Sequence, residues 1–164
     1  MKRLLLVRHA KSGWQSDVKI DFDRKLTKQG NDEANEMAAL MSRNIANVDI
    51  IITSPAIRAV ATAQYFANAF KIDFSDIQKD IGLYEKGISF IKKLIASQDI
   101  SLECIMIVGH NPILTTLTAN LTGNEIPPLE ACSVVCIDYN ITKWNEIEKI
   151  KGQLVFIEAP FILE

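Results

Sequence analysis

The two histidines of this chain are the residues best suited to catalysis. His9 comes two residues after the apolar run 4–7, and His110 comes two residues after the apolar run 105–108. An imidazole can act as a nucleophile or as a general base. Two histidines without a nearby acidic cluster make a poor metal site, because catalytic zinc usually has three protein ligands. We therefore expect reactive imidazoles here, rather than a metal site or histidines that only make structural hydrogen bonds.

The residues around these histidines suit a phosphate group. Arg8 adjoins His9, and Arg58 lies one turn into a helix predicted to begin at Pro55. Guanidinium groups stay charged and can bind two phosphate oxygens at once. Helices predicted to begin at Pro55 and Pro112 add backbone N–H groups and positive dipole ends. We expect Arg58 to serve this site rather than a surface salt bridge, which gives a phosphate site with its own nucleophile.

The elements that must position these residues follow from three short apolar runs. Runs of this kind predict strands buried on both faces, as in a parallel sheet, and they occupy residues 4–7, 49–53 and 105–108. Helical segments between them imply βαβ crossovers and a three-layer α/β/α fold with a mainly parallel central sheet. Ligands bind beyond the carboxyl ends of such strands, so the polar residues after the three runs can converge in one pocket.

The predicted helices have recognisable starts and core-facing stripes. Thr27 is the expected N-cap of a helix whose apolar stripe runs over 34–45, and a further stripe lies at 88–95. A Ser-Pro pair and an Asn-Pro pair open two other helices, at 54–70 and 111–123, with proline at the first helical position.

The C-terminal part of the chain contains two strand candidates, Ser133–Tyr139 and Gln153–Glu158. A turn-rich stretch separates them, so we expect them to form an antiparallel edge of the sheet. The chain shows no repeat and no linker long enough to divide it, and 164 residues suffice for one full core. We therefore predict a single domain over residues 1–164.

Three segments together resemble a known family. LVRHAKSGW at 6–14, TSPAIRAVATA at 53–63 and VGHNP at 108–112 are similar, in order and spacing, to the histidine phosphatase superfamily. The short chain, the RHAKS variant and FDRKLTKQG at 22–30 most resemble its small SixA-type phosphohistidine phosphatases. The resemblance runs from about residue 4 to about residue 122, and it implies a phosphoglycerate mutase-like fold.

The resemblance also implies a mechanism. His9 would attack phosphorus in line and become a phosphohistidine intermediate, which water then hydrolyses. Arg8, Arg58 and His110 would hold the phosphoryl oxygens. Such a pocket supplies alignment and charge neutralisation, so we expect neither a metal nor any other cofactor.

Four further residues have less certain roles. Asn111 and Ser12 are candidate substrate contacts, although for Asn111 we favour a role in capping the following helix. Ala10 stands where the family usually has glycine. Glu85, in the expected loop 82–87, is either a proton donor or a solvated charge. A weak acid apparatus would suit a phosphoramidate, because a protonatable imidazole leaves more easily than an alkoxide.

The leading prediction is a metal-independent phosphatase acting on phosphohistidine in a partner protein. The alternative is a phosphomonoesterase of the same superfamily that acts on a small phosphorylated metabolite. A mutase is disfavoured, because the chain lacks room for the insertions that enclose a sugar or glycerate phosphate. A phosphate-binding or phosphohistidine-binding adaptor on the same fold is disfavoured by the presence of both arginines and both histidines.

The composition of the chain limits the classes of partner and indicates the cellular compartment. Apolar residues make up 48% of the chain, charged residues 23%, and the net charge is −2, which argues against disorder and against a nucleic-acid or membrane-surface partner. The apolar stretch near the N-terminus is too short for a signal peptide, and three cysteines without a CxxC pattern indicate buried thiols. We therefore expect a cytoplasmic protein, whose oligomeric state the sequence leaves open.

The positive charge is concentrated near the N-terminus. Residues 1–30 carry eight Lys/Arg and three Asp, a net charge of +5, which leaves −7 for the remainder. Lys11, Arg24 and Lys25 are either solvated surface or a rim that steers an anionic partner toward His9. Trp14 is either an exposed contact for a protein substrate or folded back on the core.

Overall fold

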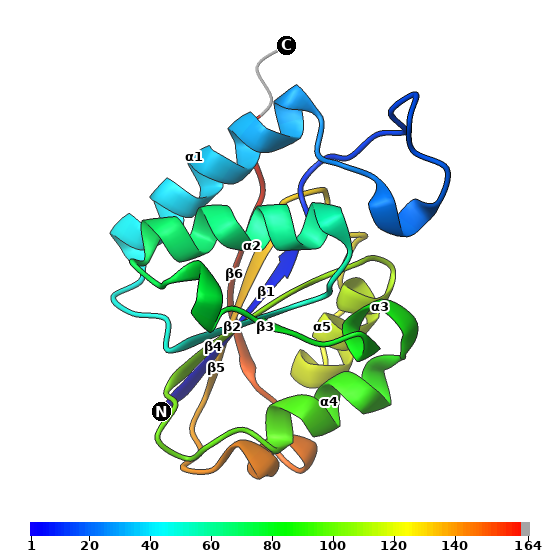
Figure 1. Cartoon of the computed structure of the whole chain (residues 1–164). Helices are drawn as coiled ribbons and strands as arrows, with labels where there is room; N and C mark the ends of the chain where they lie inside the picture. Colours follow the sequence, from blue (N-terminus) through cyan, green and yellow to red (C-terminus); the bar gives the residue numbers. More distant parts are fainter. Residues whose placement is uncertain (162–164) are drawn as a thin grey trace.

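A mostly parallel sheet forms the centre of the fold. The computed structural model describes residues 1–161, which contain a six-stranded sheet in the order β3-β2-β4-β1-β5-β6 (Figure 1). The strands are β1 Lys2–Arg8, β2 Ile50–Thr53, β3 Gln78–Lys79, β4 Cys104–Gly109, β5 Val134–Tyr139 and β6 Gln153–Glu158. The first four run parallel, whereas β5 is antiparallel to β1 and β6 to β5. The predicted fold class, including its antiparallel C-terminal edge, is confirmed.

Helices cover both faces of this sheet. They are α1 Lys28–Asn44, α2 Ile57–Ala69, α3 Gly82–Glu85, α4 Ile88–Ala96 and α5 Ile113–Thr122. Alternate residues of β1 point to opposite faces. Leu5 and Val7 pack in the core under α1 and α2, and Leu4 and Leu6 pack in the core under α4 and α5 (Figure 1). All four leucine and valine side chains have no exposed area, so β1 is buried on both sides as its sequence predicts.

The start of α1 follows the sequence prediction. Thr27 is the N-cap, and its Oγ1 accepts a hydrogen bond from the backbone N–H of Gly30 at 3.0 Å. The predicted stripe is buried and faces the sheet, with Ile45 as the C-cap residue. The same turn approaches the segment after β1 closely, because Thr27 N–H donates to the carbonyl of Lys11 at 3.0 Å.

The starts of α2 and α5 differ from the prediction by one or two residues. Helix α2 begins at Ile57 rather than Pro55, because Ser54 Oγ accepts from the N–H of Ala56 at 3.2 Å and makes a bend before the helix. Pro112 is the N-cap of α5 and not its first helical residue. Placing proline at the first helical position was therefore wrong in both cases.

Some short elements have no signal in the sequence. Strand β3 has two residues and adds to the edge of the sheet beside β2. Helix α3 replaces the loop expected at 82–87, and three 3₁₀ helices lie at Asp21–Asp23, Phe74–Asp76 and Trp144–Glu148. Elements of two to five residues are shorter than the window in which periodicity is recognisable.

The registers of the sheet align the carboxyl ends of three strands. Arg8 lies opposite Gly109 in the β1–β4 pair, and Thr53 lies opposite Val108 in the β2–β4 pair. The residues that follow each strand, His9, Ser54 and His110, therefore leave the sheet at one edge. This alignment is what the sequence pattern predicted for the polar residues after the three apolar runs.

The expectation of buried thiols is confirmed. All three cysteines are buried and free within the described part of the chain. No helix between residues 1 and 161 has the length and apolar character needed to cross a membrane. The single domain over 1–164 stays a prediction, and its last three residues lie outside the described range.

Gly30 provides a test of the contact between α1 and the segment after β1. A Cβ built there would lie 2.0 Å from the carbonyl oxygen of Lys11, so Gly30→Ala must push this backbone aside. We expect the free energy of unfolding in urea to fall by about 1–3 kcal/mol, despite the higher helix propensity of alanine. Gly87→Ala is the control, since nothing lies within 4 Å of its Cβ, and its loss should stay below about 1 kcal/mol. Equal losses would contradict the proposed clash.

Candidate active site

A polar cavity of about 700 Å³ opens at the carboxyl ends of the parallel strands. Its lining residues come from the segment after β1, from α2 and α3, and from the loop after β4. They are Arg8, His9, Lys11, Ser12, Asp21, Arg24, Arg58, Tyr84, Glu85, His110, Asn111 and Ala131. All seven residues predicted for the site line this one cavity.

His9 is held as a neutral imidazole with one defined tautomer. Its Nδ1 lies 2.8 Å from the carbonyl oxygen of Ala10, and a carbonyl can only accept, so Nδ1 carries the proton. Nε2 then carries the ring's lone pair, which accepts a hydrogen bond from Arg58 Nε at 3.3 Å and becomes free when that bond breaks. The Ala10 backbone is itself fixed, since its N–H donates to Thr62 Oγ1 at 3.0 Å. The geometry leaves Nε2 as the nucleophilic atom.

Burial keeps both histidines uncharged at neutral pH. It lowers the pKa of His9 to about 3, with smaller contributions from the charges of Arg58 and Arg8. Burial and the same arginines lower the pKa of His110 to about 4. A charged imidazole cannot attack phosphorus, so the low pKa of His9 maintains its reactive form.

His110 lies beside His9 and is oriented by Ser54. The two ring centroids are 5.1 Å apart, and His110 Nε2 lies 2.8 Å from Ser54 Oγ. Ser54 therefore contributes to the site by orienting His110, in addition to forming the bend before α2. Within residues 1–161, His110 Nδ1 has no hydrogen-bond partner and is available to a ligand.

Arg8 is oriented from one side and open on another. Its Nη1 donates to the carbonyl of Leu129 at 2.7 Å. Its Nε is buried and has no hydrogen-bond partner among residues 1–161. A buried donor without a partner is costly, so the site carries a guanidinium group whose hydrogen-bonding capacity the described residues do not use up.

Asp21 is the principal site residue that sequence reasoning missed. Its carboxylate accepts from Arg58 Nη2 at 2.8 Å, from Tyr84 Oη at 2.8 Å and from Arg24 Nη1 at 3.0 Å. Its backbone carbonyl accepts from Arg58 Nη1 at 2.7 Å. Burial favours a higher pKa for Asp21, but these hydrogen bonds outweigh it and hold the pKa well below its usual range. The available signal was an acidic residue within a segment of net charge +5.

Ser12 and Asn111, the two candidate substrate contacts, both line the cavity but bond to different parts of the protein. Ser12 lines the cavity, and its Oγ accepts from Arg24 Nη2 at 2.8 Å. Asn111 also lines it, but its Oδ1 accepts from Thr115 N–H at 3.3 Å and its Nδ2 donates to Leu129 O at 2.9 Å. The Asn111 side chain thus bonds to the first turn of α5, whose N-cap residue is Pro112. It also bonds to the Leu129 carbonyl, which accepts from Arg8 as well.

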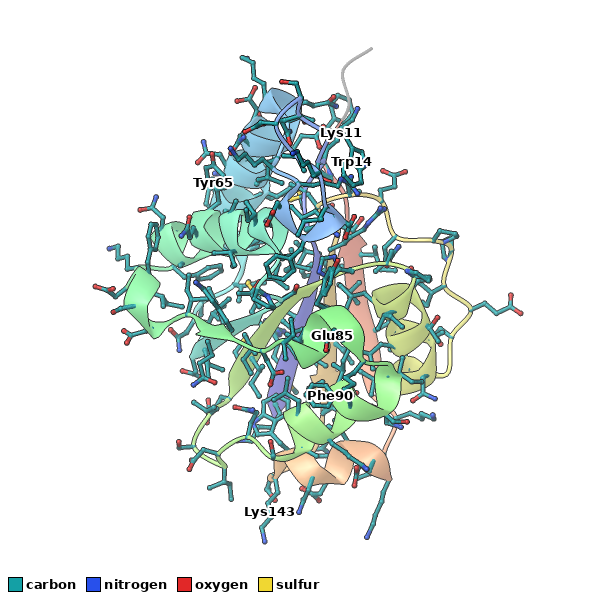
Figure 2. The ribbon with its side chains drawn as sticks, turned by 45° about the vertical axis from the view of Figure 1, so that its right-hand side comes forward. Lys11, Trp14, Tyr65, Glu85, Phe90 and Lys143 are labelled. Carbon is teal, nitrogen blue, oxygen red and sulfur yellow. The ribbon has the colours of Figure 1, made fainter. Side chains whose placement is uncertain are left out.

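The rim of the cavity is basic and aromatic. Lys11 and Arg24 line it, whereas Lys25 does not. Trp14 is 59% exposed, with the Arg24 guanidinium 5.3 Å from its ring centroid. Figure 2 shows Lys11 and Trp14 together on the segment after β1, above Glu85 on α3. Of the two possibilities for Trp14, the structure therefore favours the exposed position.

Within residues 1–161, no group of three or more His, Cys, Asp or Glu side chains is arranged to hold a metal ion. The cavity instead gathers guanidinium and ammonium groups from Arg8, Lys11, Arg24 and Arg58. This donor set matches phosphate oxygens, which accept hydrogen bonds, rather than a cation.

The sequence profile of the histidine phosphatase superfamily (branch 1) matches residues 4–89. The chain belongs to this superfamily. The match includes His9 and Arg58, and His110 lies beyond it. The predicted family is confirmed, and together with the similarity to a solved SixA-type structure this match confirms the predicted enzyme class, a histidine phosphatase.

Solved structures and curated relatives extend this result. A protein from Agrobacterium tumefaciens assigned as the phosphohistidine phosphatase SixA has a TM-score of 0.83 and 27% identity, over 98% of this chain and 99% of that chain. An uncharacterized chloroplastic protein of Arabidopsis thaliana is 28% identical over 92% of this chain and 72% of its own length. A 2,3-bisphosphoglycerate-dependent phosphoglycerate mutase of Dichelobacter nodosus is 33% identical, but over 52% of this chain and 36% of its own length.

The buried histidines of this phosphatase predict a specific loss of stability in mild acid. The unfolded chain binds protons at its histidines below pH about 6.5, whereas folded His9 and His110 stay neutral until pH about 3–4. The unfolded state then binds more protons, so the free energy of unfolding should fall by about 1–3 kcal/mol from pH 6.5 to 5. Urea unfolding at each pH gives the free energy of unfolding, and hence its slope against pH. The double variant His9→Asn/His110→Asn should lose most of this slope, and an unchanged slope would contradict the assignment.

Proposed function

We propose that this phosphatase removes phosphoryl groups from histidine residues of a partner protein, through a phosphohistidine formed at His9 and without a metal ion. Arg8, Arg58 and His110 hold the phosphoryl oxygens during both steps. The proposal is supported by the tautomer of His9, by the cationic lining of the cavity and by similarity to the SixA-type protein from Agrobacterium tumefaciens.

In the first step, the lone pair of His9 Nε2 attacks phosphorus and forms a new N–P bond. The substrate P–N bond breaks, and its electron pair returns to the imidazole of the partner protein. In the second step, a water oxygen attacks phosphorus, the bond to Nε2 breaks, and its electron pair returns to His9. One proton of the water passes to bulk solvent, and inorganic phosphate leaves with the other. Charge neutralisation and alignment are the main requirements of both steps.

The observation that favours phosphohistidine as the substrate is that neither carboxylate in the cavity is placed as a proton donor. Within residues 1–161, two carboxylates line the cavity, Asp21 and Glu85. Three hydrogen-bond donors hold Asp21 in its ionised form, so it has no proton to give. Glu85 is exposed at the end of α3. An alkoxide leaving group needs a positioned acid, whereas an imidazole that is already protonated does not, which favours a phosphoramidate.

The rim supports a macromolecular partner over a small metabolite. Trp14 has a mostly exposed ring stacked with Arg24, and Lys11 lies on the same segment. Aromatic residues and arginine are enriched at protein interfaces, and basic groups steer an anionic partner. The alternative, a small-molecule phosphomonoesterase, requires Glu85 to act as the acid.

A comparison of substrates tests the proposal. Wild-type protein should hydrolyse a phosphohistidine protein efficiently and a phosphoserine protein poorly, with equal rates in EDTA, because arginines occupy the places where a metal enzyme has ligands. Phosphate release measures each rate, and p-nitrophenyl phosphate serves as a reference substrate. Loss of activity in EDTA, restored by zinc or magnesium, would overturn the metal-independent mechanism. Efficient hydrolysis of an alkyl phosphate that Glu85→Gln reduces about 10²–10⁴-fold would favour the small-molecule alternative.

The covalent intermediate is tested separately. Brief incubation with a labelled phosphohistidine protein and acid-free quenching should label wild-type protein, and the label should be acid-labile. His9→Ala should abolish labelling, because it removes the imidazole whose unprotonated Nε2 is assigned as the nucleophile. His110→Ala is the control, and it should label more slowly but still label, since the nucleophile remains. Because His9 is buried, thermal melting must first show that each variant is folded; labelled His9→Ala would exclude His9 as nucleophile.

A further inference from the structure

We propose that the ionised carboxylate of Asp21 binds the ring N–H of the substrate phosphohistidine and so selects substrates whose phosphorylated imidazole ring is protonated and cationic. This inference rests on the proposed function and adds a specificity-determining residue to it. Neither His9 nor the phosphate-binding arginines can supply this selection, because they contact the phosphoryl group that all phosphate substrates share.

The hydrogen bonds of Asp21 leave one acceptor position for a ligand. A carboxylate offers about four lone-pair positions. Oδ2 uses two of them, for Arg58 Nη2 and Tyr84 Oη, and Oδ1 uses one, for Arg24 Nη1. The side chain is 43% exposed and lines the cavity, so the remaining position on Oδ1 is accessible to substrate.

Arg58 places this carboxylate next to the reacting atoms. The same guanidinium donates from Nε to His9 Nε2 and from Nη2 to Asp21 Oδ2. One planar group therefore joins the nucleophile to the carboxylate. Only the span of this guanidinium group and its two hydrogen bonds separates Asp21 Oδ2 from Nε2, and in the proposed complex the ring of a substrate bonded to phosphorus in front of Nε2 lies against that carboxylate.

The carboxylate is also fixed in position before substrate arrives. Tyr84 donates to it while packing edge-on against both Phe22 and His110, with ring centroids 5.2 and 5.4 Å away. Arg24 donates to it while also donating to Ser12. A negative charge that is held rigidly can stabilise a partner charge without rearrangement during the reaction.

The chemistry of the two leaving groups explains the selection. A protonated phosphohistidine ring carries a positive charge and an N–H on the nitrogen that is not bonded to phosphorus. As the bond from His9 to phosphorus forms, the P–N electron pair returns to the ring, which leaves as neutral imidazole with its N–H still donated to Asp21. An alkoxide or phenolate leaves with negative charge, which the Asp21 carboxylate repels.

Asp21→Asn tests this role, because it removes the charge and keeps the shape. We compare kcat/KM on N-phosphoimidazole, which needs no protein docking, with kcat/KM on p-nitrophenyl phosphate. The loss on N-phosphoimidazole should exceed the loss on p-nitrophenyl phosphate by about tenfold or more. If Asp21 only positioned Arg58, both substrates would lose equally, since both need Arg58, and this outcome would overturn the inference.

Two variants control for charge and for folding. Glu85→Gln removes the same charge from the same cavity and should change both substrates by the same factor. Asp21→Glu keeps the charge and should retain part of the preference for N-phosphoimidazole. This variant still tests the inference if Asp21→Asn does not fold. Wild-type turnover of phosphohistidine protein with equal losses in Asp21→Asn overturns only this inference. Absence of wild-type turnover of phosphohistidine contradicts the proposed function itself, and the inference with it.

Discussion

The parallel pairing of β1 with β4 is the constraint on which the site depends. In this register Arg8 lies opposite Gly109, and the next backbone bond, from His9 N–H to Gly109 O at 3.0 Å, continues the pairing beyond the strands. Both histidines leave the sheet at the same level, with their rings 5.1 Å apart. A shift of one residue would send every β1 side chain to the opposite face of the sheet.

Burial and positive charge act together on the histidines. Both effects disfavour a charged imidazole, and both become stronger where water is excluded. The Ala10 carbonyl then selects the nitrogen that keeps the proton. An imidazole placed among arginines therefore remains neutral without an adjacent base.

Asp21 counterbalances the cationic cavity. Its carboxylate connects Arg58 from α2, Tyr84 from α3 and Arg24 from the segment before α1. Three elements that are distant in sequence thus meet at one charge, and Arg58 links that charge to His9. The anion site and the orientation of its principal arginine consequently depend on a residue whose charge is opposite to that of the cavity.

The sequence by itself determined the strand-helix order, the sheet edge that carries the polar residues and the grouping of Arg8, His9, Arg58 and His110 in one cavity. Long apolar runs and cap residues carry those signals locally, and the carboxyl ends of parallel strands must meet at one edge. Only the tertiary structure brought Arg58 and Tyr84 to Asp21, from which they lie 37 and 63 residues away along the chain. No local pattern encodes such pairings, because a lone Asp in a basic loop has the same sequence appearance whether it is solvated or holds an arginine. The tautomer of His9 and the short helix α3 were likewise decided by packing, since each depends on neighbours that the fold alone supplies.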